Sequence, residues 1–235
     1  MMNGHDTNKM DHDERAASQH VLEPGLYALL SDNVIFPELF AAAALALASA
    51  GVRTIQLRVK DELDDSRRLA LQREVTQALT GWTGLLVVND RADLAAILRH
   101  EAPAAMRVGL HLGQDDLPPT AARRVVGPDV VVGLSTHDLT QVAAAAAEPV
   151  DYIGYGPVFA TRTKASSNPQ VGLDGLRAAA AASRWPVVAI GGVGADQAAQ
   201  CRLAGAHAVA MASALFGDEL LDLSARARAV LGSFG

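Results

Sequence analysis

The stretch "LLVVNDRADLAAILRH", residues 85–100, contains the repeating unit of the whole chain. Its four apolar residues predict a buried strand, and the Ala/Leu-rich segment from 91 to 100 predicts a helix. Between strand and helix stand Asn89, Asp90 and Arg91. Polar side chains at the mouth of a buried strand are costly unless they have partners. This junction is therefore a candidate for function.

The same unit recurs from Leu26 onward. Short apolar runs that predict strands cover residues 26–30, 54–57, 85–88, 108–112, 130–134, 152–155, 186–190 and 208–211. Helices are expected between them, in Ala/Leu-rich segments such as 37–50, 64–80, 91–100, 138–147, 173–183 and 195–204. Both faces of the runs are apolar, as in parallel strands covered by helices. Eight such units predict one α/β domain, a (β/α)8 TIM barrel over residues 24–235.

An open, doubly wound sheet is the alternative fold. The lack of a Gly-rich dinucleotide fingerprint after the first predicted strand disfavours it. Residues 1–23 are polar with scattered charges, which predicts a flexible extension outside the barrel.

Composition restricts the classes of function. Half of the 235 residues are hydrophobic and the net charge is −6, which argues against general nucleic-acid binding. No apolar run reaches the length of about 18 residues that a membrane span needs. The single cysteine, Cys201, excludes an intrachain disulfide and suits a reducing cytoplasm. We therefore expect a cytoplasmic protein that binds small molecules and no membrane.

Polar groups gather at one end of the predicted strands. In a (β/α)8 barrel, chemistry takes place where strands end and the following loops begin. Six of the eight predicted strands end beside groups suited to phosphate or metal, whereas their other ends show small-residue turns. This asymmetry predicts which end of the barrel is active.

Asp90 and Asp116 follow neighbouring predicted strands. Two carboxylates at the spacing of adjacent strands suit Mg²⁺. In the alternative interpretation, Asp90 caps the helix at 91–100 and Asp116 is a solvated turn residue. The cations Arg58, Lys60 and Lys164 on the same rim favour a polyanion held between acids and bases.

A second anion site is predicted on the opposite side of the rim. The turn "IGGVGA", residues 190–195, exposes backbone N–H groups, and loops after the seventh and eighth strands of barrels often bind phosphate. The long loop at 156–172 carries "TRTK" and suits a second anion or a lid. His137 is a general base, a pyrophosphate donor or a capping residue, whereas His111 and His207 are expected to be structural.

Six ordered motifs resemble the thiamine phosphate synthase family over roughly residues 24 to 216. They are "QLRVK" (56–60), "VNDRADLA" (88–95), "GLHLGQDDL" (109–117), "GLSTH" (133–137), "DYIGYGPVFATRTK" (151–164) and "PVVAIGGVGADQ" (186–197). The resemblance implies a Mg²⁺-dependent transferase of thiamine biosynthesis. Such an enzyme couples 4-amino-2-methyl-5-pyrimidinylmethyl diphosphate to 4-methyl-5-(2-phosphooxyethyl)thiazole and yields thiamine phosphate and pyrophosphate, here by dissociative displacement.

The resemblance also implies residue roles. Contacts to the pyrimidine diphosphate are expected from Gln56, Leu57, Arg58, Val59, Lys60, Asn89, Ser135 and Lys164. Four of these, Arg58, Lys60, Ser135 and Lys164, are expected to be catalytic, and Asp90 and Asp116 to bind the metal. The thiazole phosphate is expected to contact Thr161, Arg162, Thr163, Gly192, Ala212 and Ser213. Ala212 departs from the family, where a branched apolar residue is common.

Two other functions stay open from the sequence. A thiazole tautomerase shares the barrel but needs neither the diphosphate cations nor the metal acids. A non-catalytic, phosphate-binding regulatory barrel would bind thiazole phosphate and release no pyrophosphate. The sequence leaves the oligomeric state open, with a homodimer as one candidate.

Overall fold

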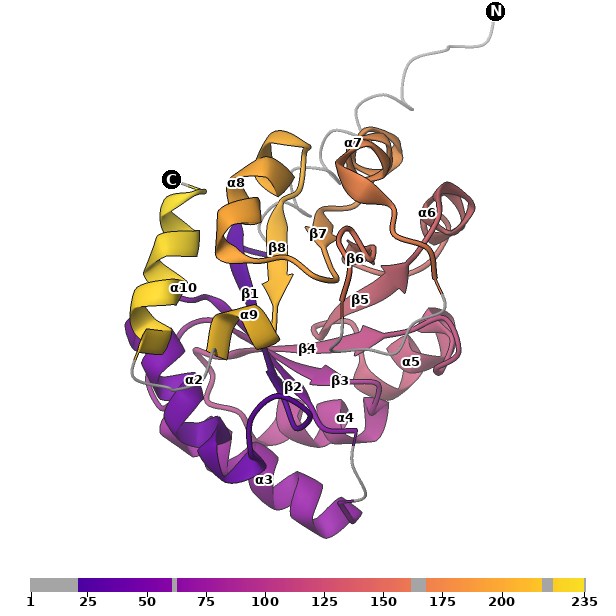
Figure 1. Ribbon diagram of the computed structural model, residues 1–235. Helices are drawn as coiled ribbons and strands as arrows, with labels where there is room; N and C mark the ends of the chain where they lie inside the picture. The colour runs from indigo at the N-terminus through magenta and orange to yellow at the C-terminus, as the bar shows by residue number, and fades with distance from the viewer. Residues whose placement is uncertain (1–20, 61–62, 162–167, 217–221, 235) are drawn as a thin grey trace, which may run out of the picture.

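The computed structural model describes residues 21–60, 63–161, 168–216 and 222–234. Within them eight parallel strands form a closed barrel in chain order, with β8 paired to β1 (Figure 1). The strands are β1 (Gly25–Ser31), β2 (Thr54–Arg58), β3 (Leu85–Asn89), β4 (Arg107–Leu112), β5 (Val131–Thr136), β6 (Tyr152–Tyr155), β7 (Val187–Ala189) and β8 (Ala208–Met211). The predicted TIM barrel is confirmed, and the doubly wound alternative is wrong.

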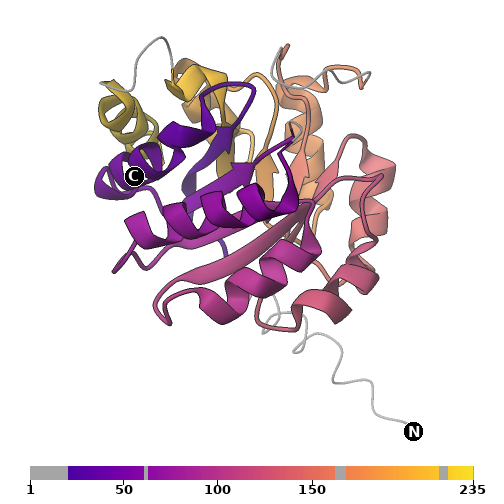
Figure 2. The same cartoon turned by 90° about the horizontal axis from the view of Figure 1, so that it is seen from below.

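Helices surround the barrel on its outside (Figure 2). They are η1 (Pro37–Leu39), α2 (Phe40–Ser49), α3 (Asp65–Ala78), α4 (Ala92–Glu101), α5 (Pro119–Val126), α6 (Leu139–Ala145), α7 (Gly172–Ala182), α8 (Ala195–Leu203), α9 (Ser213–Phe216) and α10 (Leu223–Gly232). The predicted segments did not include α5, α9 and α10. In the described part of the chain, no helix is long and apolar enough to cross a membrane.

The strands are apolar on both faces because the barrel has two cores. Along β2, Ile55 and Leu57 pack in the outer core between barrel and helices. Gln56 and Arg58 alternate with them and line the cavity inside the barrel. The inner core contains Leu22, Tyr27, Leu85, Val87, Val131, Tyr152, Val188, Ala208 and Ala210.

Leu22 closes the end of the barrel at which the strands begin. Its side chain is fully buried in the inner core, and its carbonyl accepts a hydrogen bond from His207 Nε2 at 2.6 Å. The carbonyl of Val21 accepts a second one from Arg107 at 2.8 Å. Val21 and Leu22, which the sequence placed in the flexible extension, thus pack on the barrel, and His207 is structural as expected. Residues 1–20 of that extension lie outside the described residues.

Candidate active site

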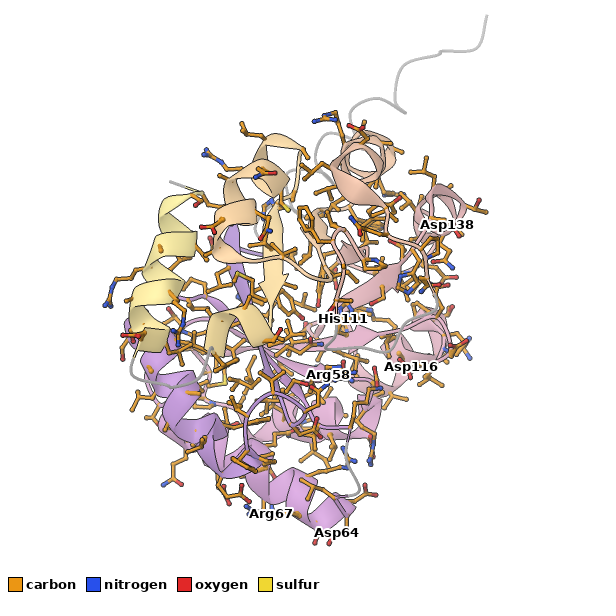
Figure 3. All side chains as sticks on the ribbon, in the orientation of Figure 1. Arg58, Asp64, Arg67, His111, Asp116 and Asp138 are labelled. Atoms are coloured by element: carbon orange, nitrogen blue, oxygen red, sulfur yellow. The ribbon has the colours of Figure 1, made fainter. Side chains whose placement is uncertain are left out.

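A cavity of about 430 Å³ opens at the ends of the strands that the sequence marked as active. Figure 3 labels Arg58, His111 and Asp116 near the centre of the barrel, whereas Asp64 and Arg67 lie far out at the start of α3. The predicted site residues that line this cavity are Gln56, Arg58, Lys60, Asn89, Asp90, Asp116, Ser135, Thr161, Gly192, Ala212 and Ser213. The fold therefore gathers residues that are up to 157 positions apart, from Gln56 to Ser213, around one space.

The remaining predicted residues fall into two groups. Leu57 is buried in the outer core and Val59 packs against it, because successive side chains of a strand point to opposite faces. Their side chains hold β2 against the helices and do not line the cavity, and contact of these two residues with substrate stays a prediction. Arg162, Thr163 and Lys164 lie outside the described residues.

Two cations stand at the end of β2, each held by a group at or just after the end of β1. A guanidinium N–H of Arg58 donates to the buried Ser31 hydroxyl at 3.0 Å, and that hydroxyl donates to Asn33 at 2.6 Å. The backbone N–H of Lys60 donates to Asp32 at 2.5 Å. These contacts aim both side chains at the cavity that they line.

Two carboxylates face these cations. Asp90 forms an ion pair with Lys60, and Asp116 lies close enough to Asp90 to affect its pKa. Asp116 is in turn held by the N–H of Gly113 at 2.7 Å. Burial raises the pKa of Asp90, and the neighbouring Asp116 adds to this rise while Lys60 opposes it. A second cation bound beside the two carboxylates would reduce the repulsion between them.

The backbone of Asp90 is unusual. Its φ of 62° lies in the left-handed region, which few residues other than glycine occupy. Its N–H donates to the carbonyl of His111 on β4 at 2.8 Å, so the strand pairing stabilises this conformation. The N-cap position of α4 belongs to Arg91, whose guanidinium binds Asp65 and Asp93. The interpretation of Asp90 as a helix cap is therefore wrong.

Two amides form the wall between the cations and the acids. Gln56 is buried on β2 and donates an N–H to the side-chain oxygen of Asn89 on β3 at 3.4 Å. This contact leaves the Gln56 oxygen as an acceptor and the Asn89 nitrogen as a donor for whatever enters the cavity. The pair can therefore form hydrogen bonds with the polar edge of a planar heterocycle.

A hydrogen-bond network runs from the inner core to the cavity. Tyr27 and Tyr152 join their hydroxyls at 2.8 Å, and Tyr152 contacts His111 Nδ1 at 3.0 Å. His111 Nε2 lies 2.9 Å from the Ser135 hydroxyl. His111 was expected to be structural; the structure shows a ring bonded at both nitrogens that also lines the cavity. Period-two alternation in "LYALL" and "VGLHL" was the signal that would have placed Tyr27 and His111 inside the barrel.

The opposite wall is a glycine turn after β7. Gly191 and Gly192 have φ of 83° and 67°, and a Cβ on Gly192 would lie 2.3 Å from the carbonyl oxygen of Ala160. Only glycine permits this turn to approach the loop after β6 so closely. Ser213, the first residue of α9, and Ala212 complete this wall.

His137 lines the cavity between the two walls. Its Nδ1 donates to the carbonyl of Gly156 at 2.6 Å, since a carbonyl can only accept. The cap of α6 is Asp138, whose carboxylate accepts the N–H of Gln141 at 2.8 Å. The capping interpretation of His137 is therefore wrong, and its roles as base or anion donor stay predictions.

Known proteins share this architecture. The chain is 43% identical to thiamine-phosphate synthase of Anaeromyxobacter dehalogenans over 181 residues, which covers 75% of each protein. It is 41% identical to that of Koribacter versatilis over 200 residues, with 83% of this chain and 90% of the relative covered. Thiamine phosphate pyrophosphorylase from Pyrococcus furiosus superposes with a TM-score of 0.76 at 27% identity, over 92% and 96% of the two chains. The family model for thiamine monophosphate synthase matches residues 26–215. This chain is an enzyme of the transferase class and belongs to the thiamine monophosphate synthase family.

Proposed function

We propose that the protein is a thiamine-phosphate synthase that joins 4-amino-2-methyl-5-pyrimidinylmethyl diphosphate to 4-methyl-5-(2-phosphooxyethyl)thiazole with the help of Mg²⁺. One observation carries the proposal: a single cavity holds two cations, two neighbouring carboxylates and, across from them, a glycine turn. Such a cavity suits two phosphorylated substrates, one of which brings a metal. The reaction transfers a pyrimidinylmethyl group, in agreement with the transferase class.

The two walls divide the substrates between them. Gln56 and Asn89 offer an acceptor and a donor to the aminopyrimidine ring, and Arg58 and Lys60 lie beside them for its diphosphate. The N–H groups of the turn at Gly192 and the start of α9 at Ser213 suit the phosphate of the thiazole. This arrangement brings the reactive carbon of one substrate towards the nitrogen of the other.

The acid pair fits the proposed metal. Among the described residues, His, Cys, Asp and Glu form no cluster of three or more that would enclose an ion alone. Mg²⁺ needs no such cluster, because one or two carboxylates with waters and substrate phosphate complete its octahedron. Asp90 and Asp116 would hold it, because both carboxylates line the cavity and each lies near enough to the other to raise the pKa of Asp90. When bound, the ion would offset charge on the departing pyrophosphate.

The bond changes require no protein nucleophile. The bond between the methylene carbon and the diphosphate oxygen breaks, and its electron pair leaves with pyrophosphate. The lone pair of the thiazole nitrogen then forms the new carbon–nitrogen bond. Arg58 and Lys60 stabilise the leaving group because it gains charge as it departs, which is often the largest contribution to catalysis. The apolar floor, which includes Leu29 and Val188, limits water at the reacting carbon.

Pyrophosphate release tests the proposal. Both substrates together should release pyrophosphate and form thiamine phosphate, and removal of Mg²⁺ with a chelator should stop both. Binding of the thiazole phosphate without any release would support the regulatory barrel instead. Isomerisation of the thiazole phosphate in the absence of the pyrimidine would support the tautomerase.

Two further properties belong to the proposal. The single, buried Cys201 suits a reducing cytoplasm. A homodimer stays a prediction, which sedimentation equilibrium would test.

A further inference from the structure

Four residues of the barrel interior form one hydrogen-bond network that leads to the cavity: Tyr27, Tyr152, His111 and Ser135. The His111 and Tyr152 rings stack with centroids 5.6 Å apart and planes at 27°. Gly133 makes room for Tyr152, since a Cβ there would lie 2.1 Å from its ring. The network therefore has a defined geometry that the strands impose. Nothing in the bond changes described above uses the tyrosines or the imidazole.

The number of available hydrogens limits which group donates and which accepts in each contact of the network. Three contacts join the four groups, and each contact needs one hydrogen. The three hydroxyls and a neutral imidazole supply one hydrogen each, which is one more than the contacts use. The extra hydrogen must therefore point out of the network at Tyr27, Tyr152 or Ser135. At Tyr152, which is fully buried, it would be left without an acceptor, so the two ends of the network remain.

The two ends differ in what they face. Within the described part of the chain, neither the Tyr27 nor the Ser135 hydroxyl bonds to a residue outside the network. Tyr27 touches the cavity floor but is only 2% exposed, among apolar residues such as Leu85 and Val188. An unsatisfied hydroxyl hydrogen there would cost free energy. Ser135 lies at the cavity, where a ligand can accept a hydrogen bond.

The phenols can only act in this way while they keep their hydrogens. Burial raises the pKa of Tyr27 and of Tyr152 well above the ordinary value for a phenol. Both phenols therefore keep their hydrogens at neutral pH. If the spare hydrogen lies at Ser135, Tyr27 donates to Tyr152 and Tyr152 donates to His111 Nδ1.

We propose that Tyr27, Tyr152 and His111 are positioning residues that hold the imidazole in its Nε2–H tautomer and so make Ser135 a hydrogen-bond donor into the cavity. His111 then donates to the Ser135 oxygen, and the Ser135 hydrogen is left for an acceptor in the cavity. The acceptor that suits it is a phosphoryl oxygen of the diphosphate substrate, a step that rests on the proposed function. In the opposite direction, Ser135 would present a lone pair to the phosphate and repel it.

The tautomer can be measured without any reaction. We would record long-range ¹H–¹⁵N correlations of the imidazoles in the full-length, ligand-free protein and assign His111 by its loss in His111→Gln. We expect the proton on Nε2 and an unprotonated Nδ1. A proton on Nδ1 of His111 would overturn the proposal, whether or not the protein makes thiamine phosphate. The proposed function and this inference can therefore fail separately.

A double-mutant cycle tests the consequence for catalysis. Tyr152→Phe should lower kcat about 3- to 10-fold, the worth of one ordinary hydrogen bond, and Ser135→Ala should lower it about 10- to 150-fold. In the Ser135→Ala background, Tyr152→Phe should change kcat less than about 2-fold, because it acts through Ser135. A full further loss in the double variant would show a merely structural role and overturn the inference.

The chain offers a matched control for this substitution. Tyr155 lies on the same strand as Tyr152, but it is buried in the outer core instead of the inner one. Tyr155→Phe also removes one phenolic hydroxyl, but from the outer core, and should leave kcat and the His111 tautomer unchanged. Tyr152→Phe, by contrast, should shift the His111 tautomer in the same spectra, and an unchanged Nε2–H form there would count against the network as its cause.

Discussion

The two ends of one barrel interior differ sharply. At the end where the strands begin, Leu22 is buried among apolar side chains, and its carbonyl is bonded to His207. At the end where they finish, the same strands carry Arg58, Asp90 and Ser135 around an open cavity. The packed end contributes to stability, whereas the charged groups at the open end face a cavity that can take a ligand. The comparison predicts that substitutions at the two ends affect different measurements.

Asp90→Asn should cause the largest loss at the open end. Asparagine tolerates the left-handed backbone of Asp90, so the variant removes the charge with little strain. We expect kcat/KM to fall at least about 100-fold, as when a preorganised electrostatic partner is removed, with weaker dependence on Mg²⁺. The neighbouring exposed residue Asp115 provides the control, since Asp115→Asn removes an equal charge that does not line the cavity. Near-normal turnover in Asp90→Asn would reject the metal assignment.

Arg58→Ala should cause the second-largest loss of activity. The guanidinium held by Ser31 faces the proposed diphosphate, and a charge-assisted hydrogen bond contributes about 1.5–3 kcal/mol, or roughly 10- to 150-fold. Product inhibition by pyrophosphate should weaken by a similar factor, which titration calorimetry with pyrophosphate and Mg²⁺ would measure. Arg67→Ala on the exposed part of α3 is the control. Equal pyrophosphate affinity in both variants would remove Arg58 from the diphosphate site.

Gly192→Ala should separate the two walls of the cavity. A methyl group there meets the Ala160 carbonyl oxygen at 2.3 Å, so the turn has to move. We expect affinity for the thiazole phosphate to fall about 10-fold, the loss of one hydrogen bond, while affinity for the pyrimidine diphosphate stays the same. Gly172→Ala has the same φ of 67° but meets nothing within 4 Å, and so controls for backbone strain alone. If affinity for the pyrimidine diphosphate falls instead, the two substrates are assigned to the wrong walls of the cavity.

Leu22→Ala should have the smallest effect on catalysis and a clear effect on stability. Removing a fully buried leucine costs about 2–5 kcal/mol of unfolding free energy. Urea denaturation should show this loss, while kcat and KM of the folded enzyme stay unchanged. Leu203→Ala, at a leucine that is 84% exposed, should change neither measurement. A drop in kcat for Leu22→Ala would show that the two ends are coupled.

Most of the fold could be predicted from the sequence. Buried strands and helices alternate regularly along the chain, and the apolar runs and Ala/Leu-rich segments follow that alternation. The bounds of β6 and β8 agree with their predicted runs to the residue. The helix α5 was missed because the four residues AARR interrupt its apolar pattern, although Pro119 and Gly127 mark its two ends. Leu22 was missed because a single apolar residue in a polar stretch has no periodicity to reveal that it is buried.

By itself, the sequence determined the barrel, its active end and the residue types gathered there, since these depend on the local order of strand, polar junction and helix. Only the tertiary structure decided which side chains meet. It separated Leu57 and Val59 from the cavity, gave Asp90 its left-handed backbone, and connected Tyr27 to Ser135 through His111. The physical reason is that a closed barrel brings distant strands together around a shared interior, and no local pattern encodes contacts across that space.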